Sequence, residues 1–280
     1  MAAITFRSPA PHLQPFVSTY WHLEADLPDR TIQSYIPGIT VAWIFNLDDA
    51  GLIRHANGSP GASDDLPACF VKGPTTVASH VEPAATTRNY GIAFKAGAAS
   101  LFTAVPLGEL RDRMLDLFAL DDRDLALLAR LVQSSGFDDV TRLFDRFLSS
   151  RLSDATDIHL GRMLYHGLCR SAGSGQSRFV LSSGYSERHL RRLFQDKLGT
   201  SPKTAARIGR LRYTLDAMQR GVQPLSQIAS SAGYFDQAHL NREFKAMIGA
   251  SPIVFQSNLA PLARRFNEFE ASPKPDRASR

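Results

Sequence analysis

The sequence predicts an α+β fold in two domains: a small β barrel with packed helices, then an all-α domain that contains one long helix. Short strand-like runs fill residues 1–97, helical periodicity follows over 98–170, and one small helical unit occurs twice between 178 and 258. A Gly/Ser-rich stretch at 171–177 separates the two domains as a linker. The polar tail at 259–280 is expected to be disordered.

Composition sets the broad class of the protein. With 280 residues, of which 44% are hydrophobic, the chain can bury a sizeable core. No apolar run approaches the roughly 20 residues that span a bilayer, and the first residues lack a charged-then-apolar leader. We therefore expect a soluble, cytoplasmic protein without a membrane partner. Cys69 and Cys169 lie far apart and outside any C-x-x-C pattern, which argues against a disulfide framework or a zinc site.

The charge is unevenly distributed along the chain. Residues 177–280 hold 17 Lys and Arg against 8 Asp and Glu, a net charge of +9. Residues 1–176 hold 15 against 19, a net charge of −4. A basic C-terminal part behind a mildly acidic N-terminal part assigns a polyanionic partner to the C-terminal part.

Residues 1–97 carry strand and turn signals. Five β-branched or aromatic runs, flanked by Pro, Gly and Asn, predict strands at 17–23, 39–45, 68–72, 76–81 and 88–95. Residues 57–67 are rich in Gly, Ser, Pro and Asp and predict a mobile loop. Several short strands with turns between them favour a small barrel or sandwich.

From residue 98 the apolar residues recur at helical spacing. This periodicity predicts helices at 108–118, 121–132, 138–152 and 157–169. One of the apolar stripes could form the seam of a homodimer. Packing of these helices onto their own domain is the simpler explanation, because most amphipathic helices bury against the domain that contains them.

The C-terminal repeat has a constant offset of 50 residues. Leu190, Phe194, Gly199 and the pair Ser201-Pro202 recur as Leu240, Phe244, Gly249 and Ser251-Pro252. Ser186 and Asp236 stand where a side-chain oxygen can cap a starting helix. Gly199 and Gly249 stand where a helix ends in the left-handed conformation. Each copy therefore predicts a helix-turn-helix, and a helix at about 202–219 joins the two copies.

The polar faces of the two capped helices carry side chains suited to DNA. Arg188 and Arg191 in the first helix and Gln237 and Asn241 in the second are predicted to read base edges, because Arg pairs with guanine and Gln or Asn with adenine. The cations predicted to bind phosphates are Arg192, Arg242 and Lys245. A merely solvated charged face is the alternative for one isolated helix, and two homologous helices with the same residue types argue against it.

The same region is similar to a known family. The Gly-Tyr-Ser-x-Arg-x-Leu-x-Arg-x-Phe run at 184–194, Arg210-Leu211, Ile228-Ala229, Phe244-Lys245 and the Gly-x-Ser-Pro at 249–252 resemble the DNA-binding domain of AraC/XylS-type transcription regulators. Thr214 and Ala238 depart from the family pattern. The resemblance implies a sequence-specific regulator, activator or repressor, that binds double-stranded DNA. It is compatible with RNA polymerase as a partner and with a homodimer.

Four short segments at 20–24, 44–47, 91–98 and 105–110 resemble the cupin-like N-terminal domain that precedes many such regulators. That resemblance implies a domain that holds a small-molecule effector or a dimer contact, and it names no ligand. By residue type, the candidates for an effector pocket are Trp21, Tyr35, Trp43, Phe45, His80 and Tyr90, with Arg88 as a further polar anchor. The alternative for each aromatic residue is that it fills the core.

The sequence offers no pattern for catalysis. It has His80-Val81-Glu82 but no His-x-His, and neither a Gly-x-Ser-x-Gly motif nor a phosphate-binding loop is present. We therefore expect no catalytic residues, metal or cofactor, and a function in binding. Two alternatives stay open: a regulator controlled by an effector in the N-terminal domain, and a ligand-independent regulator whose barrel only mediates dimerisation.

Overall fold

The computed structural model describes residues 2–26, 33–47, 53–55, 63–82, 85–120, 122–152, 184–221 and 223–258. Within these ranges the N-terminal part consists of two antiparallel sheets and two α-helices, and the C-terminal part is entirely helical. This confirms the predicted α+β class. The expected linker at 171–177, the tail at 259–280 and the helix at 157–169 lie outside the described residues.

The larger sheet has the strand order β1-β2-β9-β4-β7-β10. Its strands are β1 (Ala2–Arg7), β2 (Val17–Asp26), β4 (Ala42–Asn46), β7 (Cys69–Lys72), β9 (Thr86–Phe94) and β10 (Met114–Asp116). β2 and β9 form its longest ladder, in which Trp21 lies opposite Gly91. A Cβ atom at Gly91 would lie 1.9 Å from the Trp21 indole, so glycine is what lets this ring lie across β9.

The smaller sheet has the order β3-β8-β5-β6. Its strands are β3 (Gln33–Tyr35), β5 (Ile53–His55), β6 (Ser63–Asp65) and β8 (Ser79–Glu82). Trp21, Ile44 and Phe70 of the larger sheet share one hydrophobic cluster with Val81 of the smaller sheet. The two sheets therefore enclose an apolar layer, which we call the inter-sheet layer.

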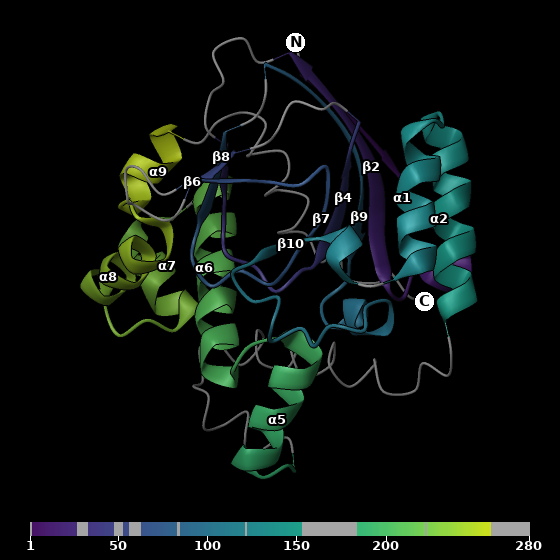
Figure 1. The fold of residues 1–280 in the computed structure, drawn as a ribbon. Coiled ribbons are helices and arrows are strands. Elements are labelled where there is room, and N and C mark those ends of the chain that lie inside the picture. The colour runs from purple at the N-terminus through teal and green to yellow at the C-terminus, as the bar shows by residue number, and fades with distance from the viewer. Residues whose placement is uncertain are drawn as a thin grey trace, which may run out of the picture.

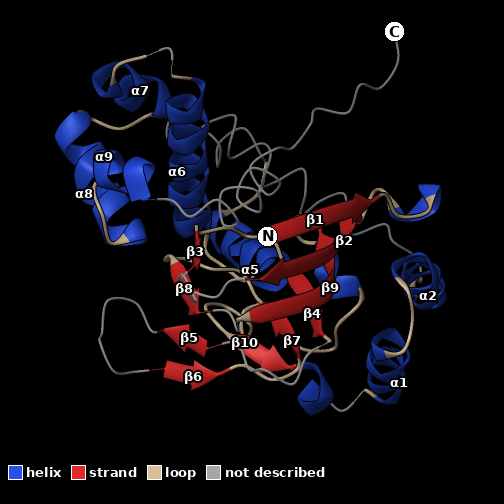
Figure 2. Cartoon of the chain, turned by 90° about the horizontal axis from the view of Figure 1, so that it is seen from above, coloured by secondary structure: helices blue, strands red, loops and turns tan. Residues whose placement is uncertain are grey.

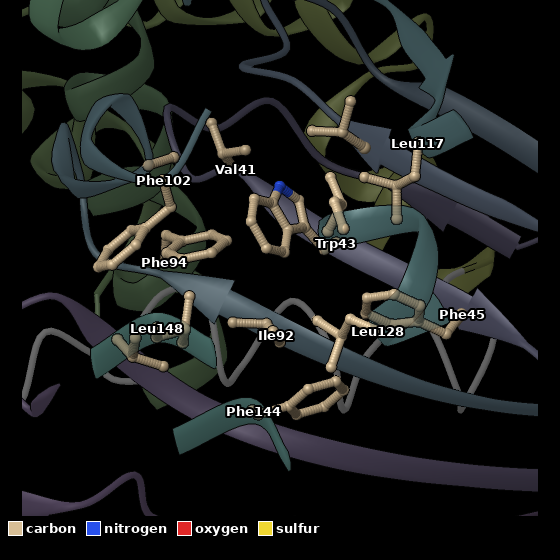
Figure 3. Packing of buried hydrophobic residues seen from close by; sticks show 14 of the residues in the cluster. Val41, Trp43, Phe45, Ile92, Phe94, Phe102, Leu117, Leu128, Phe144 and Leu148 are labelled. Carbon is tan, nitrogen blue, oxygen red and sulfur yellow. The ribbon is translucent and has the colours of Figure 1, made fainter. Parts of the chain in front are cut away.

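The other face of the larger sheet is covered by α1 (Arg123–Gln133) and α2 (Phe137–Arg151), as Figure 1 shows. Trp43, Phe45 and Phe94 from the sheet pack there with Phe144 of α2 (Figure 3). The Trp43 and Phe94 rings meet edge-on at 5.1 Å, and those of Phe45 and Phe144 lie 5.4 Å apart. We call this second apolar region the helix-side layer.

Two local predictions in the N-terminal part are wrong. Residues 108–118 were expected to be helical, but Met114–Asp116 forms β10, which pairs with β7 at the sheet edge. Asp112 adopts φ +59° and accepts hydrogen bonds from the backbone N and the hydroxyl of Thr76, which ends any helical course there. The loop expected at 57–67 is wrong at Ser63–Asp65, which pairs with β5, while residues 57–62 lie outside the described ranges. Tertiary pairing overrides local propensity at both places.

The C-terminal part contains α5 (Glu187–Leu198), α6 (Pro202–Arg220), α7 (Leu225–Ala232), α8 (Gln237–Ile248) and α9 (Pro252–Asn258). The predicted caps are confirmed: Ser186 and Asp236 accept hydrogen bonds from the backbone N–H groups of His189 and His239. Gly199 and Gly249 end α5 and α8 with φ of +65° and +88°. The sequence repeat thus corresponds to two matching helices on either side of α6.

The two parts of the molecule are in contact. Ile36, Ile39 and Ala78 of the N-terminal part are buried in the same hydrophobic cluster as the C-terminal helices. Arg212 Nε of α6 donates to the Pro37 carbonyl at 2.8 Å, and the Ala78 N–H donates to the Met247 carbonyl at the end of α8 at 2.7 Å. Figure 2 shows β3 and β8 on the side of the sheets that faces α6.

No helix among the described residues is long and apolar enough to cross a membrane. Within those same residues, no group of three or more His, Cys, Asp or Glu side chains could hold a metal ion. Cys69 is a buried thiol in β7, and burial raises its pKa to about 12. Cys169 lies outside the described ranges.

Candidate functional site

The first helix predicted to read DNA is α5; we refer to it and to α8 as the reader helices. The buried face of α5 consists of Leu190, Phe194 and Leu198, while Arg188, Arg191 and Arg192 are exposed. Arg191 Nη2 lies 3.5 Å from Glu187 Oε1, one turn earlier on the same surface. Exposed pairs of this kind contribute at most about 1 kcal/mol, so Arg191 can leave its partner for a nucleic acid at little cost.

The second reader helix, α8, has the same division of faces. Leu240, Phe244, Met247 and Ile248 are buried, while Gln237, Arg242 and Lys245 are exposed. Asn241 differs from the other predicted readers because it is half-buried, and its side-chain oxygen is buried without a hydrogen-bond partner among the described residues.

Helix α6 separates the two readers. Its 19 residues correspond to about 28 Å at a rise of about 1.5 Å per residue, comparable to the roughly 34 Å of one turn of B-DNA. Figure 1 shows α5 beside one end of α6, with α7 and α8 along its flank. The structure thus places α5 at one end of this long helix and α8 against its flank, where Glu243 binds Arg207 and Arg210.

Glu243 joins α8 to α6. Its Oε1 accepts a hydrogen bond from Arg207 Nε at 3.0 Å, and its Oε2 accepts one from Arg210 Nη2 at 2.9 Å. Burial acts to raise the pKa of this carboxyl, but the hydrogen bonds and charges of Arg210 and Arg207 outweigh it, so the pKa lies below its ordinary value. The Arg210 guanidinium also lies over the Tyr234 ring, 5.3 Å from its centroid.

Phe235 is a candidate contact that the sequence analysis missed. It lies between α7 and the Asp236 cap, and 93% of its surface is exposed. A difference in spacing between the two copies of the repeat indicates the extra residue in this turn. Gly184 stands six residues before Leu190, whereas Gly233 stands seven before Leu240, so the second turn is one residue longer.

The six candidate effector residues do not share one site. Trp21 and Tyr35 belong to the inter-sheet layer, whereas Trp43, Phe45 and Tyr90 belong to the helix-side layer. His80 alternates with the buried Ser79 and Val81 along β8, which places its side chain on the other face of that strand.

Both layers contain buried polar atoms without a described partner. In the inter-sheet layer, the Trp21 indole N–H donates to Asn89 Oδ1 at 3.0 Å. By strand alternation Asn46 and Ser79 face the same layer, and their side-chain oxygens are buried without partners among the described residues. In the helix-side layer, the Trp43 indole nitrogen (blue in Figure 3) likewise has no described partner. Unpaired buried polar atoms are uncommon in proteins and often mark sites with a further role.

Two protein-family models match separate segments of the chain. Residues 182–258 match the model of a helix-turn-helix domain, and residues 5–116 match a domain of unknown function, DUF6597. The C-terminal segment is similar to this helix-turn-helix family. The match confirms the double helix-turn-helix prediction and the AraC/XylS-type resemblance for this part of the chain.

Among curated proteins, the chain is similar to the invasion protein InvF of Salmonella typhi and to InvF of Salmonella typhimurium (strain LT2). Each is 33% identical over 98 residues, which is 34% of this chain and 45% of the relative. The chain therefore matches less than half the length of these relatives.

Among solved structures, ToxT from Vibrio cholerae has a TM-score of 0.47 at 12% identity and covers 86% of this chain and 98% of its own. ToxT bound to an unsaturated fatty acid has a TM-score of 0.46 at 11% identity and covers 91% and 98%.

Proposed function

We propose that this protein is a sequence-specific DNA-binding transcription regulator in which α5 and α8 enter successive major-groove faces of one duplex. The observation that carries the proposal is the presence of two homologous, capped helices with exposed cationic and amide faces, both held beside the same long helix α6. The net charge of +9 on residues 177–280 supplies the matching electrostatic attraction. RNA polymerase is a candidate protein partner under the same proposal.

The proposal is tested by selecting random duplexes with the full-length protein, followed by sequencing and a salt titration. We expect enrichment of two short motifs about one helical turn, or about 10 base pairs, apart. The observed affinity should also fall steeply with salt, because phosphate contacts release counterions. Recovery of unenriched sequence by a protein that binds DNA would contradict sequence-specific recognition.

We propose that the polar side chains of α5 and α8 have two separate roles in DNA binding. Arg188, Arg191, Gln237 and Asn241 contact base edges, and Arg192, Arg242 and Lys245 contact phosphates. For Asn241 this requires its side chain to turn outward on binding, because its oxygen is buried in the free protein. Phe235, exposed beside the start of α8, is placed to pack against sugar or a thymine methyl group at the groove edge.

Two variants test this division. Arg191→Ala should cost about 1–3 kcal/mol on the selected site and relax the preference at one base pair. Lys245→Ala should weaken all duplexes evenly and reduce the salt slope by about one unit. Arg142→Ala removes an equally exposed arginine from α2 in the N-terminal part and should change neither quantity. Equal losses on every duplex from both reader variants would contradict the assignment.

We further propose that a small-molecule effector binds in the inter-sheet layer and controls DNA occupancy. Trp21 and Tyr35 offer apolar contact there, and the unpaired oxygens of Asn46 and Ser79 offer polar anchors. The N-terminal contacts to α6 and α8 provide a route by which two states of this layer would differ in DNA affinity.

The rival proposal is a ligand-independent regulator whose N-terminal part only forms a homodimer. It draws on exposed Leu127 and Leu131, one turn apart on α1. A thermal-shift screen with small metabolites separates the two proposals, because a ligand that binds only the folded state raises the melting temperature. A hit whose shift is lost in Tyr35→Ala supports the effector site. A protein that forms concentration-dependent dimers and shows no shift supports the rival.

A further inference from the structure

Glu243 occupies a position at which the two halves of the repeat differ. The offset of 50 residues places Leu193 of α5 where Glu243 stands in α8. Leu193 is half-buried and packs against the C-terminal hydrophobic cluster. A repeat built only for packing would carry an apolar residue in both places. The second copy has a carboxylate there instead, and only 17% of that side chain is exposed.

The orientation of the Glu243 side chain is fixed by hydrogen bonds to both of its carboxylate oxygens. Arg207 and Arg210 lie about one turn apart on α6, and each donates a hydrogen bond to one oxygen of the Glu243 carboxylate. His239, one turn before Glu243 on α8, brings its Nε2 to 3.9 Å from Oε1, and its Nδ1 accepts the N–H of Phe235 at 3.2 Å. Three elements therefore meet at this carboxylate: α6, α8 and the turn that precedes α8.

The ionic contact at Glu243 restricts the rotation of α8 about its axis, whereas an apolar contact at the same position would allow small rotations. Side chains such as Leu193 tolerate small rotations, because dispersion contacts are individually weak and lack direction. Two charge-assisted hydrogen bonds from two guanidinium groups are directional, and rotating α8 about its axis would break at least one of them. The proposed reader residues Gln237 and Lys245 lie on the exposed side of the same helix. Its rotation therefore decides where they point.

We propose that Glu243 is a positioning residue for DNA recognition, which holds α8 in one orientation on α6 through Arg207 and Arg210 and thereby sets the spacing between the two half-sites. This inference rests on the proposed function, because it requires that α5 and α8 bind the same duplex. Glu243 itself makes no contact with DNA under this proposal.

The test measures binding to duplexes in which the spacer between the two selected motifs is lengthened or shortened by one or two base pairs. We expect the full-length protein to lose at least about tenfold in affinity per base pair of change, because each base pair also rotates the half-site around the helix axis. Glu243→Leu, which installs the residue of the first copy, should reduce that loss to about threefold or less. Asp216→Asn, which removes a carboxylate on α6 paired with Arg220, should keep the wild-type spacing profile.

The outcomes are distinct. If Glu243→Leu weakens binding to all spacers alike and keeps the wild-type preference, its role is structural and the proposal is overturned. Should that variant not unfold cooperatively, Glu243→Gln has the same shape and decides instead: an unchanged spacing profile overturns the proposal and a flattened one supports it. A wild-type protein without any spacing preference also overturns the inference while leaving DNA binding intact. A protein that binds no duplex overturns the proposed function itself.

Discussion

The two reader helices have nearly the same sequence plan but different neighbours. Helix α8 is held by α6 through Glu243, whereas α5 rests on the N-terminal part. A Cβ atom at Gly199, at the end of α5, would lie 2.4 Å from the Leu107 carbonyl oxygen, and one at Gly108 would lie 2.2 Å from the Gln195 amide. The corresponding Gly249 at the end of α8 has nothing within 4 Å. Similar helices can therefore be oriented by different supports: α5 by close contacts with the N-terminal part, and α8 by Glu243 on α6 together with one hydrogen bond from the Ala78 N–H.

The largest expected effect tests whether both units fold together. Phe194→Ala and Phe244→Ala each remove a fully buried ring at equivalent positions, and each should cost about 3–5 kcal/mol of unfolding free energy. Chemical denaturation followed by helical circular dichroism measures the loss. If one variant shows a separate transition at lower denaturant concentration, the helix-turn-helix unit that contains the substitution unfolds independently of the other unit.

The next effect separates the two supports directly. Gly249→Ala should cost about 1 kcal/mol, because alanine is strained at a positive φ. Gly199→Ala carries that strain and also the clash with Leu107, so it should cost about 2–4 kcal/mol in the full-length protein. The measurement is the shift in denaturation midpoint. Equal costs for the two substitutions would mean that α5 does not rest on the N-terminal part in solution.

The helix caps should differ by a smaller amount. Asp236 Oδ1 accepts the His239 N–H at 2.6 Å, while Ser186 Oγ accepts the His189 N–H at 3.3 Å. Each alanine substitution should cost about 1 kcal/mol, with Asp236→Ala the larger because a carboxylate also interacts favourably with the helix dipole. Thermal unfolding of the two variants gives the order. The reverse order would show that cap geometry is not what differs between the units.

The smallest effect is a pH dependence confined to the second unit. The pKa of Glu243 is lower in the folded protein than its unfolded value of about 4.3. Its contribution to stability is therefore present above about pH 4.3 and lost as the pH falls through the folded pKa. Amide hydrogen exchange between pH 5 and pH 3, corrected for intrinsic rates, should show protection falling more in α8 than in α5. Glu243→Gln should abolish that difference, and its persistence in the variant would assign the acid sensitivity to other groups.

Much of this comparison was visible in the sequence because helix signals are local. The caps at Ser186 and Asp236, the terminal glycines and the offset of 50 fixed the helices on either side of α6 to within about two residues. Glu243 was not singled out, because a carboxylate on a helix is usually solvated. Its partners Arg207 and Arg210 lie more than 30 residues away, beyond the reach of any local pattern.

The N-terminal part was predicted less completely for the same physical reason. Strands rich in aromatic residues at 17–23, 39–45 and 88–95 were found, whereas the three-residue strands β3, β5, β6 and β10 depend on pairing partners distant in sequence. The sequence identified the aromatic residues of these strands but not the face of the sheet on which each one lies. Trp21 and Trp43 lie on opposite faces of the larger sheet, Trp21 in the inter-sheet layer and Trp43 in the helix-side layer. A shift of one residue in strand register would exchange those faces.

Hydroxyl-radical footprinting of the full-length protein on its selected duplex tests most directly whether both readers engage one DNA. We expect two protected patches on the same face of the duplex, about 10 base pairs apart. Arg191→Ala should weaken the patch under α5, and Arg242→Ala the patch under α8. A single protected patch, weakened by only one of these substitutions, would contradict the account, because one reader would then be bound and the other free.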